Sequence, residues 1–146
     1  MFEVEVRNVS GRPLAVGSAG AHTLIVDRPA DGGGDGLGFN GGELLYLAIA
    51  GCVSNDLFRE ARSQGIALDG VRVSVSGGFS GEPAVSGAVE YEVELSGAAP
   101  VERLRALVDQ VDRIAEIPNS LRSGTQVRLR SARVVESASA APAGDG

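Results

Sequence analysis

The feature that most constrains the fold is an uncharged run of ten residues, from Leu44 to Val53. It falls within a predicted helix over about residues 43–64, which ends at Gly65 because glycine is common just after a helix. The first half of this helix is apolar nearly all round, so it must be buried on most sides. The run is too short to span a bilayer.

One layer of strands can cover only one side of such a helix. We expect a single sheet of about six strands, and the second predicted helix is too amphipathic to cover all that remains. The sequence therefore predicts a homodimer in which the two copies of the uncharged helix lie near the two-fold axis.

Alternation of apolar and polar residues predicts antiparallel strands on both sides of this helix. Before it, residues 2–6, 14–18 and 22–27 predict a meander of three strands. After it, residues 71–79 and 88–95 alternate strictly, as half-buried antiparallel strands do, and the Gly, Pro and Ser residues between them predict a hairpin.

A second helix is predicted from Pro100, with apolar residues mostly three and four apart, and Pro118 should end or kink it. Residues 127–135 predict a last strand. Residues 136–146 are rich in small side chains, and we expect a disordered tail there. The order of elements predicts one α+β domain over residues 1–135, with helices packed on antiparallel sheet.

Composition excludes several classes of function. The net charge of −6 argues against nucleic-acid binding, which needs a basic surface to neutralise phosphates. All thirteen cationic residues are arginines, so Schiff-base chemistry and a P-loop lysine are excluded. The N-terminus lacks the features of a signal peptide, and one cysteine closes no disulfide within the chain. We therefore expect a cytoplasmic protein that binds neither nucleic acid nor membrane.

The glycine-rich segment 30–42 contains a match to G-x-G-x-x-G at residues 36–41. A dinucleotide-binding turn follows a strand directly and belongs to a parallel β-α-β unit. Here eight residues separate Asp27 from Gly36, and no parallel unit follows. We interpret the segment as a flexible loop that leads into the helix, and we predict no cofactor.

The single cysteine, Cys52, has two interpretations. A lone cysteine among alanine, isoleucine and valine is most often a small buried hydrophobe. A reactive thiolate deep inside the helix would need a cation from elsewhere, and only arginine is suitable. The single histidine, His22, opens an apolar segment and is predicted at a strand edge. One histidine and one cysteine offer too few ligands for a typical zinc site, so we predict no metal.

The segment that contains Cys52 resembles the OsmC/Ohr family. The resemblance rests on a glycine-rich loop followed by Gly-Glu-Leu-Leu at residues 42–45, and on Ala-Gly-Cys at residues 50–52, with the cysteine nine residues after Glu43. Val-Asp at residues 26–27 and Gly-Gly at residues 32–33 also fit. The similarity extends over nearly the whole chain, to about residue 135.

This resemblance implies an OsmC-like α+β fold, with antiparallel sheets around a buried central helix, in an intertwined homodimer. Many members reduce organic hydroperoxides. In them the first cysteine attacks the peroxide, and a second, in a Cys-Pro motif at the end of the second helix, resolves the sulfenic acid. A glutamate near the start of the first helix and an arginine from the N-terminal strands assist. On this chain the implied catalytic residues are Cys52, Glu43 and Arg12, with Arg7 as the second choice of arginine.

The sequence departs from that pattern. The resolving position, just before Pro118, is Ile117, which can neither resolve a sulfenic acid nor close a disulfide. The acid usually stands ten residues before the cysteine, where this chain has Gly42. Glu43 could equally be a first-turn acid that complements the helix dipole, and Arg12 could be a solvated residue without a catalytic role.

Two functions therefore follow from the sequence. The first is a one-Cys organic hydroperoxide reductase of oxidative stress defence, in which Cys52 becomes a sulfenic acid and an external thiol reduces it. The alternative is a non-peroxidatic OsmC-like dimer that binds a small apolar ligand, with Cys52 as a relic or a redox sensor. An arginine guanidinium within reach of the Cys52 sulfur would favour the first function.

Overall fold

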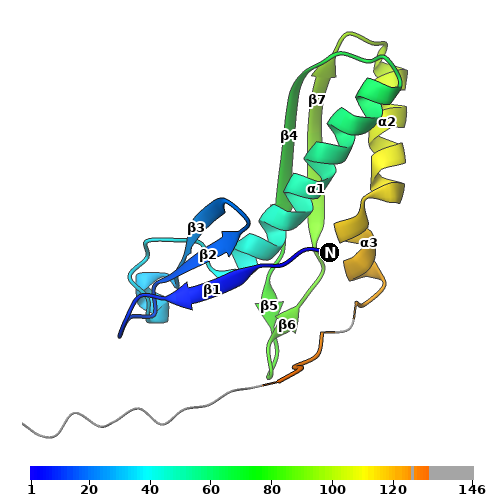
Figure 1. Ribbon diagram of the computed structural model, residues 1–146. Coiled ribbons are helices and arrows are strands. Elements are labelled where there is room, and N and C mark those ends of the chain that lie inside the picture. Colours follow the sequence, from blue (N-terminus) through cyan, green and yellow to red (C-terminus); the bar gives the residue numbers. More distant parts are fainter. Residues whose placement is uncertain (126, 132–146) are drawn as a thin grey trace, which may run out of the picture.

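The computed structural model describes residues 1–125 and 127–131, which form an α+β fold (Figure 1). Strands β1 (Glu5–Asn8), β2 (Ala15–Ala19) and β3 (His22–Val26) form an antiparallel sheet in the order β1-β2-β3. The predicted N-terminal meander is confirmed, and His22 is the first residue of its last strand.

The carboxylate of Asp27 organises the glycine-rich loop that follows β3. Its side chain is buried and accepts backbone N–H bonds from Arg28, Asp35 and Leu37 at 2.8, 3.1 and 3.0 Å. These bonds, above all the one from Leu37, lower the pKa of Asp27. The loop is therefore closed around a negative charge that the backbone amides stabilise.

Two glycines allow the loop to pack closely on its neighbours. A Cβ at Gly34 would lie 2.1 Å from the carbonyl oxygen of Arg28, and one at Gly38 would lie 2.4 Å from that of Ile25. The short 3-10 turn η1 (Ala30–Gly32) lies ahead of Gly34, and after Gly38 the loop continues to helix α1. Close backbone contact explains why these two positions need glycine.

Helix α1 (Gly41–Ser63) begins two residues before the predicted start. The side chain of Asn40 caps it by accepting the N–H bonds of Gly42 and Glu43, at 2.9 and 3.0 Å. The carboxylate of Glu43 accepts the N–H of Asn40 in return, at 2.8 Å, which completes a capping box. Gly65, with a φ of +67°, turns the chain out of the helix as predicted.

Two long strands follow α1, β4 (Leu68–Ser76) and β7 (Glu90–Gly97), which pair antiparallel. The two-stranded hairpin β5 (Phe79–Ser80) and β6 (Val85–Ser86) extends between them. The two strands predicted after the first helix are therefore confirmed, and so is the hairpin between them.

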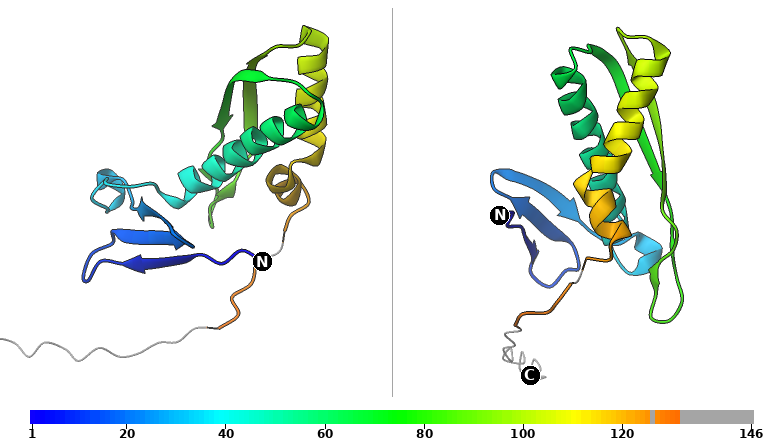
Figure 2. Two further views of the ribbon diagram at one scale, coloured as in Figure 1. Left: turned by 45° about the horizontal axis from the view of Figure 1, so that its top comes forward. Right: turned by 90° about the vertical axis from the view of Figure 1, so that its right-hand side faces the viewer.

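Helices α1 and α2 (Val101–Ile114) cover the same face of the β4–β7 pair (Figure 2). The short helix α3 (Glu116–Arg122) follows α2 after Ala115 and contacts α1. The apolar side chains of β4 and β7 point toward these helices, while the alternate residues are exposed. The core residues are Val53, Leu57, Ala61, Ile66, Leu107, Val111 and Ala115.

Three predictions about the architecture are wrong. The described residues form sheets of three, two and two strands in place of a single sheet of about six, because α1 runs from the N-terminal sheet to the β4–β7 pair (Figure 1). The second helix ends at Ile114, ahead of Pro118. Pro118 lies in the first turn of α3, where a missing N–H removes no helical hydrogen bond.

The third wrong prediction is the last strand. Residues 127–131 are not in a strand, and residues 132–135 lie outside the described part of the chain. Val127 and Leu129 are exposed. An alternating pattern becomes a strand only where a neighbouring edge accepts its hydrogen bonds.

The tail predicted over residues 136–146 also lies outside the described residues. Within residues 1–125 and 127–131, no helix is both long enough and apolar enough to cross a membrane.

Candidate functional site

Cys52 lies on α1 and is half-buried. Within the described part of the chain its sulfur has two polar contacts, the Oδ2 atom of Asp56 at 3.9 Å and the Oε2 atom of Glu116 at 3.8 Å. Asp56 is one helical turn further along α1, and Glu116 is the first residue of α3. The break between α2 and α3 at Ala115 thus places a carboxylate beside the thiol.

Asp56 connects the thiol to a cation. The Asp56 side chain is only 5% exposed. Its Oδ1 atom forms an ion pair with the Nη1 atom of Arg59 at 2.6 Å. Arg59 also binds Glu60 at 3.0 Å. The hydrogen bond to Glu60, followed by the charges of Asp56, Glu60 and Glu116, raises the pKa of Arg59. A fixed positive charge therefore borders the cluster on the side of Asp56.

Asp56, Arg59 and Glu116 are not among the site residues predicted from the sequence. For the first two a signal exists, because residues four and seven positions after Cys52 lie on the same face of a helix. Glu116 could not be found by spacing, since it comes from another element. Its one signal is that it immediately precedes Ile117, the position that the resemblance places at the thiol.

The predicted catalytic residues Glu43 and Arg12 lie elsewhere in the chain. Glu43 is in the capping box at the start of α1, and Arg12 forms an ion pair with Asp35 at 2.7 Å. Cys52 follows Glu43 by nine helical positions, which span about 13 Å along the helix axis. Within one chain, the structure brings Cys52 together with Asp56 and Glu116, and it does not bring Glu43 to the thiol. Their predicted catalytic roles stay predictions.

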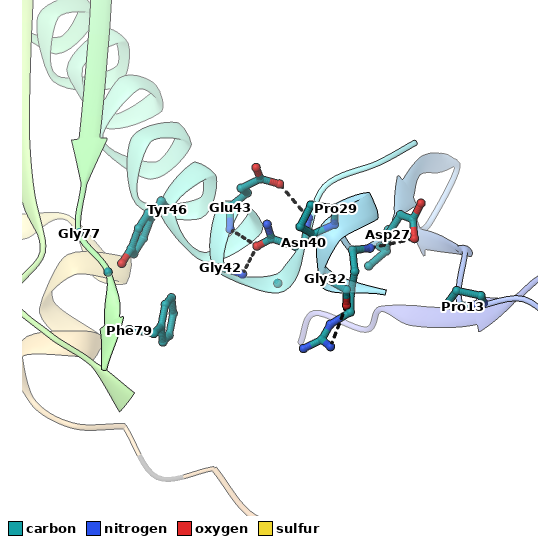
Figure 3. Close-up of a pocket in the computed structure, with 14 residues that line it drawn as sticks. Pro13, Asp27, Pro29, Gly32, Asn40, Gly42, Glu43, Tyr46, Gly77 and Phe79 are labelled. Carbon is teal, nitrogen blue, oxygen red and sulfur yellow. Dashed lines mark hydrogen bonds between the residues drawn. The ribbon is translucent and has the colours of Figure 1, made fainter. Parts of the chain in front are cut away.

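Glu43 lines an open cleft of about 710 Å³ between the glycine-rich loop, the start of α1 and the β5 strand (Figure 3). The rings of Tyr46 and Phe79 stack on one side of it, with centroids 6.2 Å apart. The hydroxyl of Tyr46 is buried and has no hydrogen-bond partner among the described residues. It lies over Gly77, where a Cβ would be 2.6 Å from that hydroxyl. The cleft thus combines aromatic walls with a carboxylate.

A second, smaller cavity of about 330 Å³ lies between α1, the β6–β7 region and α3. Its walls are mostly apolar. The hydroxyl of Tyr91 and the guanidinium of Arg122 both bind the carboxylate of Asp112. Burial, and then the contact with Asp112, raises the pKa of Tyr91 to about 12. The lining residues are Leu45, Ile49, Ser86, Gly87, Val89, Tyr91, Pro118, Leu121 and Arg122.

The family model described as OsmC-like protein matches residues 32–130, about two-thirds of the chain. This chain belongs to the OsmC-like family. The predicted resemblance and fold class are therefore confirmed. A search of curated proteins gives no match.

Solved structures of OsmC-like proteins share the fold. An OsmC-like protein from Mycoplasma pneumoniae is 15% identical, with a TM-score of 0.74, over 88% of this chain and 92% of that one. The organic hydroperoxide resistance protein OsmC from Legionella pneumophila is 18% identical, with a TM-score of 0.62, over 84% and 89%. The organic hydroperoxide resistance protein OhrB from Bacillus subtilis is 18% identical, with a TM-score of 0.58, over 85% and 92%.

Proposed function

We propose that this OsmC-like protein protects against organic hydroperoxides as a one-Cys reductase. The thiol of Cys52 attacks the peroxide, which gives the sulfenic acid and an alcohol. Two external thiols then reduce the sulfenic acid, which restores the Cys52 thiol and gives water and the disulfide of the two external thiols. The observation that carries the proposal is the place of Cys52 in the family segment, half-buried and within 4 Å of the first residue of α3.

The names of the relatives from Legionella pneumophila and Bacillus subtilis support the same class of substrate. The cleft at the start of α1 also supports it, because its stacked rings of Tyr46 and Phe79 suit the apolar part of an organic hydroperoxide. Ile117 excludes resolution by a cysteine at that position, so an external thiol is required.

We also propose that the protein is a homodimer with a composite site. Leu47 and Phe58 are exposed on α1, on the side away from the β4–β7 pair, together with Gly51. Covering this apolar face with a second copy would remove it from water. Glu43 and Arg12 of that copy could then approach Cys52, which neither reaches within its own chain. Sedimentation of a stable, folded monomer at micromolar concentration would contradict the dimer.

Treatment with one equivalent of an organic hydroperoxide tests the proposed reaction. We expect Cys52 to gain one oxygen and to react with a probe specific for sulfenic acid, as seen by mass spectrometry. The variant Cys52→Ser is the control and should remain unmodified. An unmodified wild-type thiol, in protein shown to be folded, would rule out the reductase.

The second function, a non-peroxidatic dimer that binds an apolar ligand, is favoured by two features. Both polar groups in contact with the Cys52 sulfur among the described residues are carboxylates, whereas reactive thiols usually lie beside cations. The mostly apolar cavity beside α3 is large enough for a small ligand. Binding of an apolar fluorescent probe that Leu121→Arg abolishes and Cys52→Ser leaves unchanged would support this function over the first.

A further inference from the structure

Three side chains around Cys52 have the spacing of a metal site. The ligand atoms of Cys52, Asp56 and Glu116 all lie within 4.8 Å of one another, and the two sulfur–oxygen distances are 3.9 and 3.8 Å. Bonds of about 2.0 to 2.3 Å around a tetrahedral zinc ion place neighbouring ligand atoms roughly 3.3 to 3.8 Å apart. The sulfur and both carboxylates are therefore close to coordination distance without movement of the backbone.

A buried carboxylate points one of its oxygens into this cluster. The Asp56 side chain is 5% exposed, and its Oδ1 atom is taken by Arg59. Its Oδ2 atom accepts a long S–H hydrogen bond from Cys52 at 3.9 Å, and that thiol is its one hydrogen-bond donor among the described residues. A thiol is a weak donor to a buried carboxylate oxygen, and a cation between that oxygen and the sulfur would bind it more strongly.

The surroundings of Asp56 also match a metal ligand. Carboxylates that bind metals are usually held by a second group, and the guanidinium of Arg59 holds Asp56 at 2.6 Å. A thiolate and two carboxylates carry three negative charges, and a divalent ion together with Arg59 balances them. Glu116 is exposed and Cys52 half-exposed, so an ion can enter from solvent.

We propose that Cys52, Asp56 and Glu116 bind a divalent transition metal ion of the zinc type. Binding replaces the thiol proton by the metal, and one proton is released for each ion bound. The thiolate disfavours Mg²⁺ and Ca²⁺, which prefer oxygen ligands alone. Three protein ligands leave a position for water, as in open zinc sites. The inference does not depend on the proposed reductase activity.

The sequence predicts no metal site because histidine and cysteine are the ligands that a pattern search counts first. The other two ligands here are carboxylates, one a turn away on α1 and the other sixty-four residues further on, at the start of α3. Only the fold brings them to the thiol.

Titration of the reduced, full-length protein with Co²⁺ tests the site, because a cobalt–thiolate bond gives charge-transfer absorption in the near ultraviolet. We expect this absorption to saturate at one ion per chain, to be lost on addition of Zn²⁺ and to persist in excess Mg²⁺. It should be absent in Cys52→Ser. Glu116→Gln should weaken Co²⁺ binding at least tenfold.

Glu102→Gln is the matched control, because Glu102 is an exposed acid in the first turn of α2, and it should bind Co²⁺ as the wild type does. Circular dichroism of each variant checks that it is folded. No charge-transfer band in the wild type at millimolar Co²⁺ would overturn the proposal. So would a band of unchanged affinity in both Glu116→Gln and Asp56→Asn, since the carboxylates would then not be ligands. Neither result depends on whether a peroxide reacts.

Discussion

Replacing Ile117 by cysteine tests where the start of α3 lies relative to the thiol. The residue before it, Glu116, is 3.8 Å from the Cys52 sulfur through its carboxylate. If the side chain of residue 117 is equally close, Ile117→Cys restores the missing resolving thiol. A disulfide forms where Cα atoms are about 4.4 to 6.8 Å apart. We therefore expect one equivalent of organic hydroperoxide to convert the variant to an internal disulfide.

The cost of this substitution should be small. Full burial of an isoleucine side chain contributes about 1.5 to 3 kcal/mol, and Ile117 is 37% exposed. Cysteine retains part of the buried surface, so the reduced variant should lose about 1 kcal/mol of unfolding free energy. The disulfide closes a loop of about 65 residues and should stabilise the oxidised form by about 4 kcal/mol through chain entropy. Urea titration of both forms measures these differences.

Ile25→Cys is the matched control, since Ile25 is 38% exposed and lies in the N-terminal sheet. It should give no disulfide within the chain. Mass spectrometry distinguishes the outcomes, because a disulfide loses two hydrogens and a sulfenic acid gains one oxygen. A folded Ile117→Cys protein that keeps both thiols after peroxide treatment, while wild-type Cys52 is oxidised, would refute the placement of residue 117 at the thiol.

Three further predictions follow from the structure. Mixing Glu43→Ala with Cys52→Ser chains should restore peroxidase activity above both parent proteins, because one site of the mixed dimer is intact; no gain on mixing would contradict action across the interface. Leu57→Ala should lower the unfolding free energy by about 2 to 5 kcal/mol in urea, since Leu57 is fully buried. The pKa of Asp27 is lowered in the folded state, so its stabilising effect is present above its unfolded pKa of about 3.9 and is lost as the pH falls through the folded pKa. The difference in unfolding free energy between wild type and Asp27→Asn should therefore shrink from pH 7 toward pH 3, and a constant difference would contradict the assignment.

The local elements could be predicted from the sequence because each depends on neighbours in the chain. Strict alternation gave β4 and β7, and Gly65 gave the end of α1. The start of α1 differs from the prediction by two residues because Asn40 is the capping residue. The predicted end of the second helix lies later than the break at Ala115, because Pro118 belongs to the first turn of the next helix.

The chemistry at Cys52 depends on contacts that no local pattern contains. A cysteine in an apolar run suggests a dry pocket, yet its sulfur lies beside two carboxylates. Asp56 is buried in spite of its charge because Arg59, one turn further along the same helix, neutralises it. Arg59 therefore approaches the thiol only through Asp56. The charges close to Cys52 in the folded protein thus decide whether it acts as a nucleophile or as a metal ligand. A partner chain that brings Arg12 to the sulfur would favour the thiolate nucleophile. The carboxylates of its own chain favour a bound cation.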